Sequence, residues 1–139
     1  MAEILSGYLT DNVKITKVSD HTTAGTSDVT SSSVDMAGWD GVMFLTSLGT
    51  AAAGNIVTLH SSTDDSSFSA TAALKSSGTS DEDVAVDLQS PINRYWKAVV
   101  TRGTSTTCET IWAVQYRGRA KAQTFAVSGT SCVGQFNGV

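Results

Sequence analysis

The stretch RYWKAVVTR, residues 94–102, decides the fold class because its side chains alternate with a period of two. One alternate set is Trp96, Ala98 and Val100, and the set opposite it is Tyr95, Lys97 and Val99. In a β-strand, successive side chains point to opposite faces of the sheet. The stretch therefore predicts a β-strand.

Similar runs recur along the chain, short, rich in Val, Thr and aromatic residues, and separated by Gly, Ser, Asp and Asn. The run IWAVQY at 111–116 alternates in the same way, as does IVTLH at 56–60. No segment keeps a helical period over two turns without interruption. Strands are predicted over Val13–Val18, Asp28–Val34, Gly41–Leu48, Asn55–Ser62, Phe68–Leu74, Val84–Leu88, Arg94–Arg102, Thr110–Arg117 and Gln123–Ser128.

Short strands at this spacing predict an all-β, single-domain β-sandwich, a jelly roll of about eight or nine short antiparallel strands. Residues 13–128 are predicted to form the sandwich and residues 129–139 a Gly/Ser-rich C-terminal tail. Residues 1–12 form either a short edge strand or an arm laid on a neighbouring subunit. Gly103–Thr107 is predicted to close a hairpin between strands 94–102 and 110–117.

The composition sets the class of protein. The 139 residues make one domain, and with 40% hydrophobic residues, many of them alanine, the core is small. A lone subunit is expected to be marginally stable, so association is expected. No apolar run is long enough for a membrane helix, and the start has no secretory signal pattern. Cys108 and Cys132 are therefore expected to be reduced, in the cytosol where the chain is made, and a disulfide between them is the alternative.

Charge divides the chain unevenly, because residues 1–93 hold twelve of the thirteen acidic residues and residues 94–139 hold six of the nine basic ones. This is either ordinary surface scatter or, as we favour, a basic strip beside the predicted hairpin that faces carboxylates of a partner. The strip consists of Arg94, Arg102, Arg117, Arg119 and Lys121. A nucleic acid partner is not expected, because the net charge is −4 and aromatic residues do not interleave a basic run.

No catalytic constellation is visible in the sequence. The repeated Gly-Thr-Ser tripeptides lack the final glycine of a nucleophile elbow, and no phosphate-binding loop is present. The two cysteines and two histidines lack the spacing of zinc ligands, and His60 is interpreted as structural. The acidic turns at 64–65 and 81–83 do not match a calcium loop. The sequence therefore predicts no enzyme, no cofactor and no metal site.

Three segments together resemble a known group of proteins: VDMAGWDGVMF at 34–44, LHSSTDD at 59–65, and RYWKAVVTR at 94–102 with AVQY at 113–116. In this order they are similar to small tailed-bacteriophage proteins that look like capsid decoration (cement) proteins. The resemblance spans about residues 26–120. The family often has an aromatic residue directly after the Asp-Asp turn, whereas here Phe68 comes three residues later.

The resemblance implies a β-sandwich that binds the outer surface of a virion capsid, commonly as a homotrimer, with the major capsid protein as its partner and no membrane involved. Arg94, Arg102, Arg117 and Arg119 are then expected near acidic partner surfaces, with Lys121 in the same strip. The arm is expected to be anchored by Ile4, Leu5, Tyr8 and Leu9. The core is expected to contain Trp39, Phe44, Tyr95, Trp96, Trp112 and Tyr116.

The alternative is a carbohydrate- or host-surface-binding module of a virion, in a fibre, tail or neck. Exposed and clustered tryptophans would favour it, and buried tryptophans favour the cement protein. Trp39, Trp96 and Trp112 therefore decide between the two.

Overall fold

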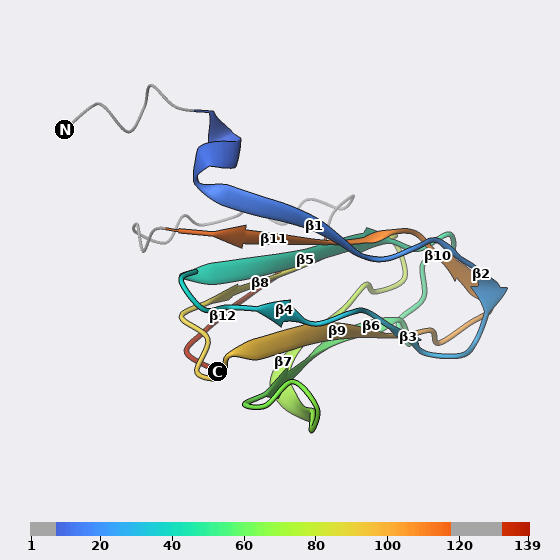
Figure 1. The fold of residues 1–139 in the computed structure, drawn as a ribbon. Coiled ribbons are helices and arrows are strands. Elements are labelled where there is room, and N and C mark those ends of the chain that lie inside the picture. Colours follow the sequence, from blue (N-terminus) through green and yellow to red (C-terminus); the bar gives the residue numbers. More distant parts are fainter. Residues whose placement is uncertain (1–7, 118–131) are drawn as a thin grey trace.

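The computed structural model describes residues 8–117 and 132–139, which are almost entirely β-structure (Figure 1). The strands are β1 (Val13–Ser19), β2 (Thr22–Gly25), β3 (Val29–Thr30), β4 (Val34–Asp35), β5 (Gly41–Ser47), β6 (Ile56–Ser62), β7 (Ser69–Ser76), β8 (Asp83–Gln89), β9 (Tyr95–Thr101), β10 (Thr106–Cys108), β11 (Ile111–Tyr116) and β12 (Cys132–Asn137). Helical structure in this part of the chain is a single 3-10 turn, η2 (Leu9–Asp11), and no described helix is long and apolar enough to cross a membrane. The predicted all-β class is confirmed.

Two sheets face each other as layers in Figure 1. The upper sheet has the strand order β1-β11-β5-β8-β12, and the lower sheet has the order β3-β9-β6-β7, with β4 also paired to β9. A short β2–β10 ladder lies at the right end. The antiparallel pairs are nested along the chain: β1 with β11, β3 and β4 with β9, β5 with β8, and β6 with β7.

The core fills the space between the two sheets. Every second residue of β9 is buried, and Trp96, Ala98 and Val100 have no exposed surface. The inward face of β11 is the set with Ile111, Ala113 and Gln115, whereas Trp112 and its set face outward. The predicted alternation in these strands is confirmed, and the buried set of each strand contributes to one core.

The predicted strand 28–34 is divided into β3 and β4. Between them, Ser31 forms two hydrogen bonds with Ala98 of β9 in place of regular backbone pairing. Its backbone N donates to Ala98 O and its Oγ accepts from Ala98 N, both at 2.9 Å. A side-chain oxygen thus replaces one backbone carbonyl of the sheet. The strands β2 and β10, three to four residues long and rich in Thr, were not predicted.

The predicted hairpin at Gly103–Thr107 is wrong. β9 belongs to the lower sheet and β11 to the upper sheet, so the segment between them crosses from one layer to the other and forms β10 on the way. β9 and β11 bury their inward faces in the same core from opposite layers. The crossing is tight, because a Cβ added to Gly103 would lie 2.4 Å from Gly54 Cα.

The predicted C-terminal tail is also different, because residues 132–137 form β12. This strand pairs in parallel with β8, from Cys132 opposite Val84 to Asn137 opposite Gln89, whereas all strands were expected to be antiparallel. Phe136 packs against the core. Of residues 1–12, the described part forms η2 rather than an edge strand, and the predicted strand 123–128 lies outside the described residues.

Candidate functional site

The turn after β4, the start of β9 and the end of β11, which carry parts of the resemblance, meet at the left end of Figure 1. Arg94 donates to Asp35 from Nε and Nη2, at 2.8 Å to Oδ1 and 2.9 Å to Oδ2. The backbone N of Ala37 also donates to Asp35 Oδ1, at 3.0 Å. These hydrogen bonds, that from Arg94 first, lower the pKa of Asp35 to about 2. The ion pair fixes the turn after β4 against the start of β9.

Gln115 and Tyr116 of β11 complete this junction. The buried Gln115 donates from Nε2 to Asp35 O at 2.8 Å. The ring of Tyr116 lies across Gly41, where a Cβ would stand 2.2 Å from ring Cζ, and its hydroxyl donates to Asp87 Oδ1 at 2.6 Å. Burial raises the pKa of both Asp87 and Tyr116, and the hydrogen bond raises that of Tyr116 further. The contacts of Gln115 and Tyr116 therefore hold the subunit together.

Backbone hydrogen bonds run across the same end and bring distant segments together. They join Arg117 to Asn12, Asp40 to Tyr116, Ser90 to Asp40, and Ile92 to Val139. The start of the described chain, the end of β11 and the C-terminus therefore lie along one end of the molecule.

This end exposes apolar side chains beside a cation. Tyr8 is 82% exposed, Leu9 74% and Ile92 73%, and the guanidinium of Arg117 lies 4.9 Å from the centre of the Trp39 ring. No described carboxylate forms an ion pair with Arg117, since the ion pairs among the described residues are Lys17–Asp20, His21–Glu109 and Arg94–Asp35. We call Tyr8, Leu9, Trp39, Ile92 and Arg117 the terminal-end surface. Apolar side chains exposed at one end of a subunit make that end a candidate contact surface for another molecule.

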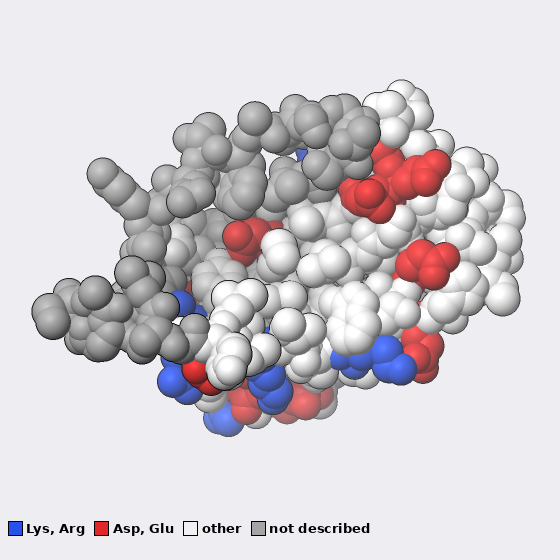
Figure 2. Space-filling view, turned by 90° about the horizontal axis from the view of Figure 1, so that it is seen from above, with Lys and Arg blue, Asp and Glu red and all other residues white. Residues whose placement is uncertain are grey.

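The predicted interface residues are thus only partly brought together. Tyr8, Leu9 and Arg117 belong to the terminal-end surface, and Arg94 lies at the same end, exposed but bound to Asp35. Ile4, Leu5, Arg119 and Lys121 lie outside the described residues. Figure 2 looks down on the upper sheet and shows basic groups mixed with acidic ones along its lower edge, so the described residues form no continuous basic strip on this face. Ile92 was not predicted as an interface residue, because a single apolar residue in a loop gives no periodic signal in the sequence.

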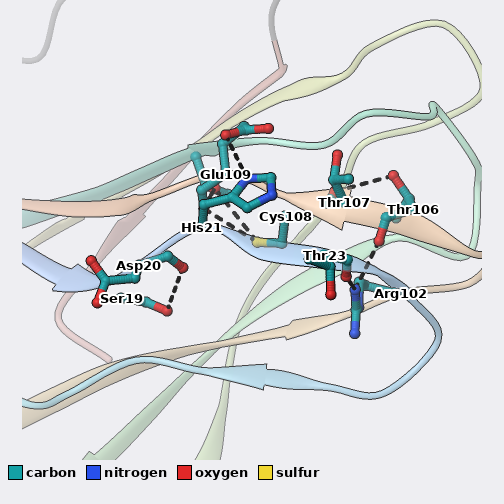
Figure 3. A network of polar contacts seen from close by, with 10 residues as sticks. Ser19, Asp20, His21, Thr23, Arg102, Thr106, Thr107, Cys108 and Glu109 are labelled. Carbon is teal, nitrogen blue, oxygen red and sulfur yellow. Dashed lines mark hydrogen bonds and ion pairs between the residues drawn. The ribbon is translucent and has the colours of Figure 1, made fainter.

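Arg102 differs from the expectation that it faces a partner, because it is 6% exposed and lies at the opposite end of the subunit. Its Nε donates to Ser27 O at 2.7 Å. Its Nη1 donates to Thr23 O and Thr106 O, both at 2.8 Å (Figure 3). The guanidinium thereby joins β2, the turn that follows β2, and β10. Because the hairpin does not form, Arg102 ends a strand of the lower sheet at the crossing between layers.

Of the groups that chemistry would need, His21 and Glu109 lie next to Cys108, and His60 lies apart from them on β6. His21 Nδ1 lies 2.9 Å from Glu109 Oε2 at the surface (Figure 3), His60 lies on the outer face of the lower sheet, and Cys108 is a buried free thiol. Burial raises the pKa of Cys108. Among the described residues, no three His, Cys, Asp or Glu side chains come together as metal ligands do.

His60 is expected to make stability depend on pH. Burial, and then the charge of Lys97, lower its pKa below the ordinary value of 6.5. The unfolded chain binds this proton more readily, so the free energy of unfolding is highest above pH 6.5 and falls as the pH drops through the folded-state pKa. Urea unfolding between pH 7.5 and 5.0 measures this loss, and His60→Gln should show less of it. Identical pH profiles for the two proteins would contradict the role of His60.

The tryptophans do not form a platform. Trp96 is fully buried and Trp39 packs against the core beside Arg117. Trp112 was assigned to the core, which is wrong: it is 40% exposed on the outer face of the upper sheet, because the opposite set of β11 faces inward. Phe44 is buried as expected, and Tyr95 and Tyr116 are half-buried.

No known protein family, curated protein or solved structure matches this chain.

Proposed function

We propose that the protein is a bacteriophage virion structural protein, a capsid decoration (cement) protein that binds the outer surface of the head and stabilises it. Its partners are the major capsid protein and further copies of itself, as a homotrimer. Two features support this: the motif resemblance and a small subunit built from strands.

We further propose that the subunit is a jelly roll. A jelly roll is one long antiparallel hairpin folded over on itself, so its strands pair first with last and inwards from there in two sheets. The nested pairs described above follow this scheme, with β1 and β11 outermost and β6 and β7 innermost. The paired strands divide alternately between the upper and lower sheets, as folding such a hairpin requires. β12 is then an addition to the edge of this scaffold.

The mechanism is mechanical. A subunit that bridges neighbouring capsid proteins adds contact area that must be lost before the shell opens, and many copies act together. The observation that carries this proposal is the terminal-end surface, where Tyr8, Leu9 and Ile92 are largely exposed beside an arginine that has no carboxylate partner among the described residues. We assign this surface to the capsid or to a neighbouring copy.

Purified particles test the proposal directly. Mass spectrometry and imaging should find the protein on the outer surface, at a copy number near that of the major capsid protein. A handful of copies at one vertex or along a tail would contradict decoration of the head. Native mass measurement of the isolated protein tests the trimer, and a strict monomer at all concentrations would contradict it.

Removing the apolar groups of the terminal-end surface is expected to release the protein from capsids. In Leu9→Ser with Ile92→Ser, each change removes apolar area worth about 1.5 kcal/mol or more when buried, so the affinity should fall at least roughly a hundredfold. Occupancy of stripped particles, titrated with purified protein, measures this fall. Leu74→Ser is the matched control, because Leu74 is 47% exposed on β7, away from this surface.

Arg117→Ser in the same assay separates charge from apolar contact. Its affinity should fall most at low salt, where a pairing with carboxylates is least screened. If the double variant Leu9→Ser with Ile92→Ser and the variant Arg117→Ser both occupied capsids as fully as the unmodified protein at every ionic strength, the terminal-end surface would not be part of the interface.

The alternative function, a carbohydrate- or host-surface-binding module, is favoured by one observation, the exposure of Trp112. An aromatic ring at the surface can stack on a sugar ring. Glycan binding that is lost in Trp112→Ala, with few copies per particle, would establish this function in place of the first.

A further inference from the structure

The outer face of the upper sheet carries a cluster of apolar side chains. Ile15 of β1 pairs with Val114 of β11, and Val114 pairs with Met43 of β5. In the next row, Trp112 pairs with Leu45. Residues that pair in register point to the same face of a sheet. All five are partly exposed, Ile15 at 52% and Trp112 at 40%, and we call them the upper-sheet face.

Charged groups border the upper-sheet face and are bound to other residues. Lys17, opposite Trp112 on β1, forms an ion pair with Asp20, and Asp87 on β8 accepts the hydroxyl of Tyr116. Figure 2 looks down on this side of the molecule and shows uncharged groups across its centre. An antiparallel sheet that faces water usually carries polar side chains on that side. The apolar cluster therefore indicates a contact site.

The described chain begins on the same side of the sheet. The turn η2 lies above the upper sheet in Figure 1. Hydrogen bonds fix this turn, because Tyr8 N donates to Asp11 Oδ2 at 2.9 Å and Asn12 N donates to Leu9 O at 3.0 Å. Tyr8 is 82% exposed and Leu9 74%, so the turn packs little against its own subunit. It therefore presents the preceding segment to another molecule rather than to its own sheet.

We propose that residues 1–7 of one copy of the chain cover the upper-sheet face of a neighbouring copy. This segment, MAEILSG, contains the apolar residues Met1, Ile4 and Leu5 and a single charged side chain, that of Glu3. Seven extended residues reach roughly 24 Å, whereas β1, β11 and β5 together span only about 10 Å at the usual strand spacing. The segment is therefore long enough to cross the whole face.

A contact of this kind also fits a closed assembly. When each copy gives its first residues to the next copy, the contact is head-to-tail, and it closes into a ring if the rotation between copies fits. A homotrimer is such a ring. The inference rests on the self-association in the proposed function and adds which segment and which face form the contact. It does not depend on binding to the capsid.

Photo-cross-linking from the upper-sheet face tests what covers it. In the full chain, Ile15 is replaced by the photoreactive residue p-benzoylphenylalanine, and isotope-labelled and unlabelled copies are unfolded and refolded together before irradiation. Cross-links to residues 1–7 are expected, and they should join a labelled copy to an unlabelled one. Cross-links within one copy only, cross-links to any other segment, or no cross-links would each overturn the proposal.

Sedimentation of the isolated protein measures the contribution to assembly. In Ile4→Ser with Leu5→Ser, the dissociation constant of the trimer should rise at least roughly tenfold, because two apolar side chains of each copy lose their burial. Ile15→Ser should also raise it. Glu3→Gln, which keeps the apolar residues of the segment, and Leu74→Ser, which changes an exposed residue of the lower sheet, are the matched controls and should leave it unchanged.

These measurements separate this inference from the proposed function. If the unmodified chain forms trimers and the variant Ile4→Ser with Leu5→Ser forms them equally well, the exchange of residues 1–7 is wrong and the proposed function stands. If the unmodified chain is a monomer at all concentrations, the homotrimer and the exchange are both wrong, and the occupancy of particles alone then decides on capsid decoration.

Discussion

Replacing Arg102 by methionine is expected to lower the free energy of unfolding by about 3 kcal/mol or more. Methionine retains most of the apolar stem but leaves Ser27 O, Thr23 O and Thr106 O without their donor. A buried acceptor without a partner is destabilising by about 1–3 kcal/mol. Urea unfolding followed by fluorescence measures the change.

Two further substitutions separate the hydrogen bonds from the charge. Arg102→Lys keeps the charge, but the single ammonium group of lysine cannot replace a planar guanidinium that donates to carbonyls in two directions. This variant should therefore remain strongly destabilised. Arg117→Met removes an exposed arginine and should change stability by less than about 0.5 kcal/mol. Equal stability of Arg102→Met and the unmodified protein would show that the three carbonyls find other donors.

Gly103→Ala is the second substitution with a large expected effect, a loss of about 2–3 kcal/mol. Its Cβ would lie 2.4 Å from both Gly54 Cα and Gly54 C, and these are backbone atoms that no side-chain rotation can move. The backbone of Gly103 is held as well, because its N donates to Asn55 Oδ1 at 3.0 Å, and Asn55 is fully buried. The two loops must therefore separate, which breaks this hydrogen bond.

Gly78→Ala is the control for Gly103→Ala. Gly78 has a φ of +74° but nothing within 4 Å of an added Cβ, so this change tests backbone strain without close contact and should lower the free energy of unfolding by about 1 kcal/mol. A loss in Gly103→Ala no larger than in Gly78→Ala would contradict the role of the contact with Gly54.

The regular strands could be predicted from the sequence, and the crossings between layers could not. β6, β9 and β11 were predictable because one face of each strand is buried, and the side chains on that face, every second one in the sequence, are uncharged. β2 and β10 are too short to show a period, and both are rich in threonine. β12 is a strand because β8 offers it a parallel edge to pair with, and its own Gly134 and Asn137 predict a loop.

The candidate site was predictable where apolar residues stood outside the strands and, for Arg117, from the excess of basic residues after position 93. Tyr8 and Leu9 gave such a signal, because apolar groups before the first strand have no core to enter. Arg102 gave a misleading signal, because the sequence does not show whether an arginine side chain is exposed or buried. Its position depends on three carbonyls from Thr23, Ser27 and Thr106, which no sequence pattern relates to it.

The nested pairing also sets the order in which the chain is able to fold. β6 and β7 are neighbours in sequence and can pair as soon as both are made. β1 has to wait for β11, because Val13 pairs with Tyr116. During synthesis on the ribosome the first strand therefore stays unpaired until most of the chain has emerged, and such long-range closure is slow. Lysine side chains on an edge strand disfavour its pairing with another chain, and β1 carries exposed lysines at positions 14 and 17.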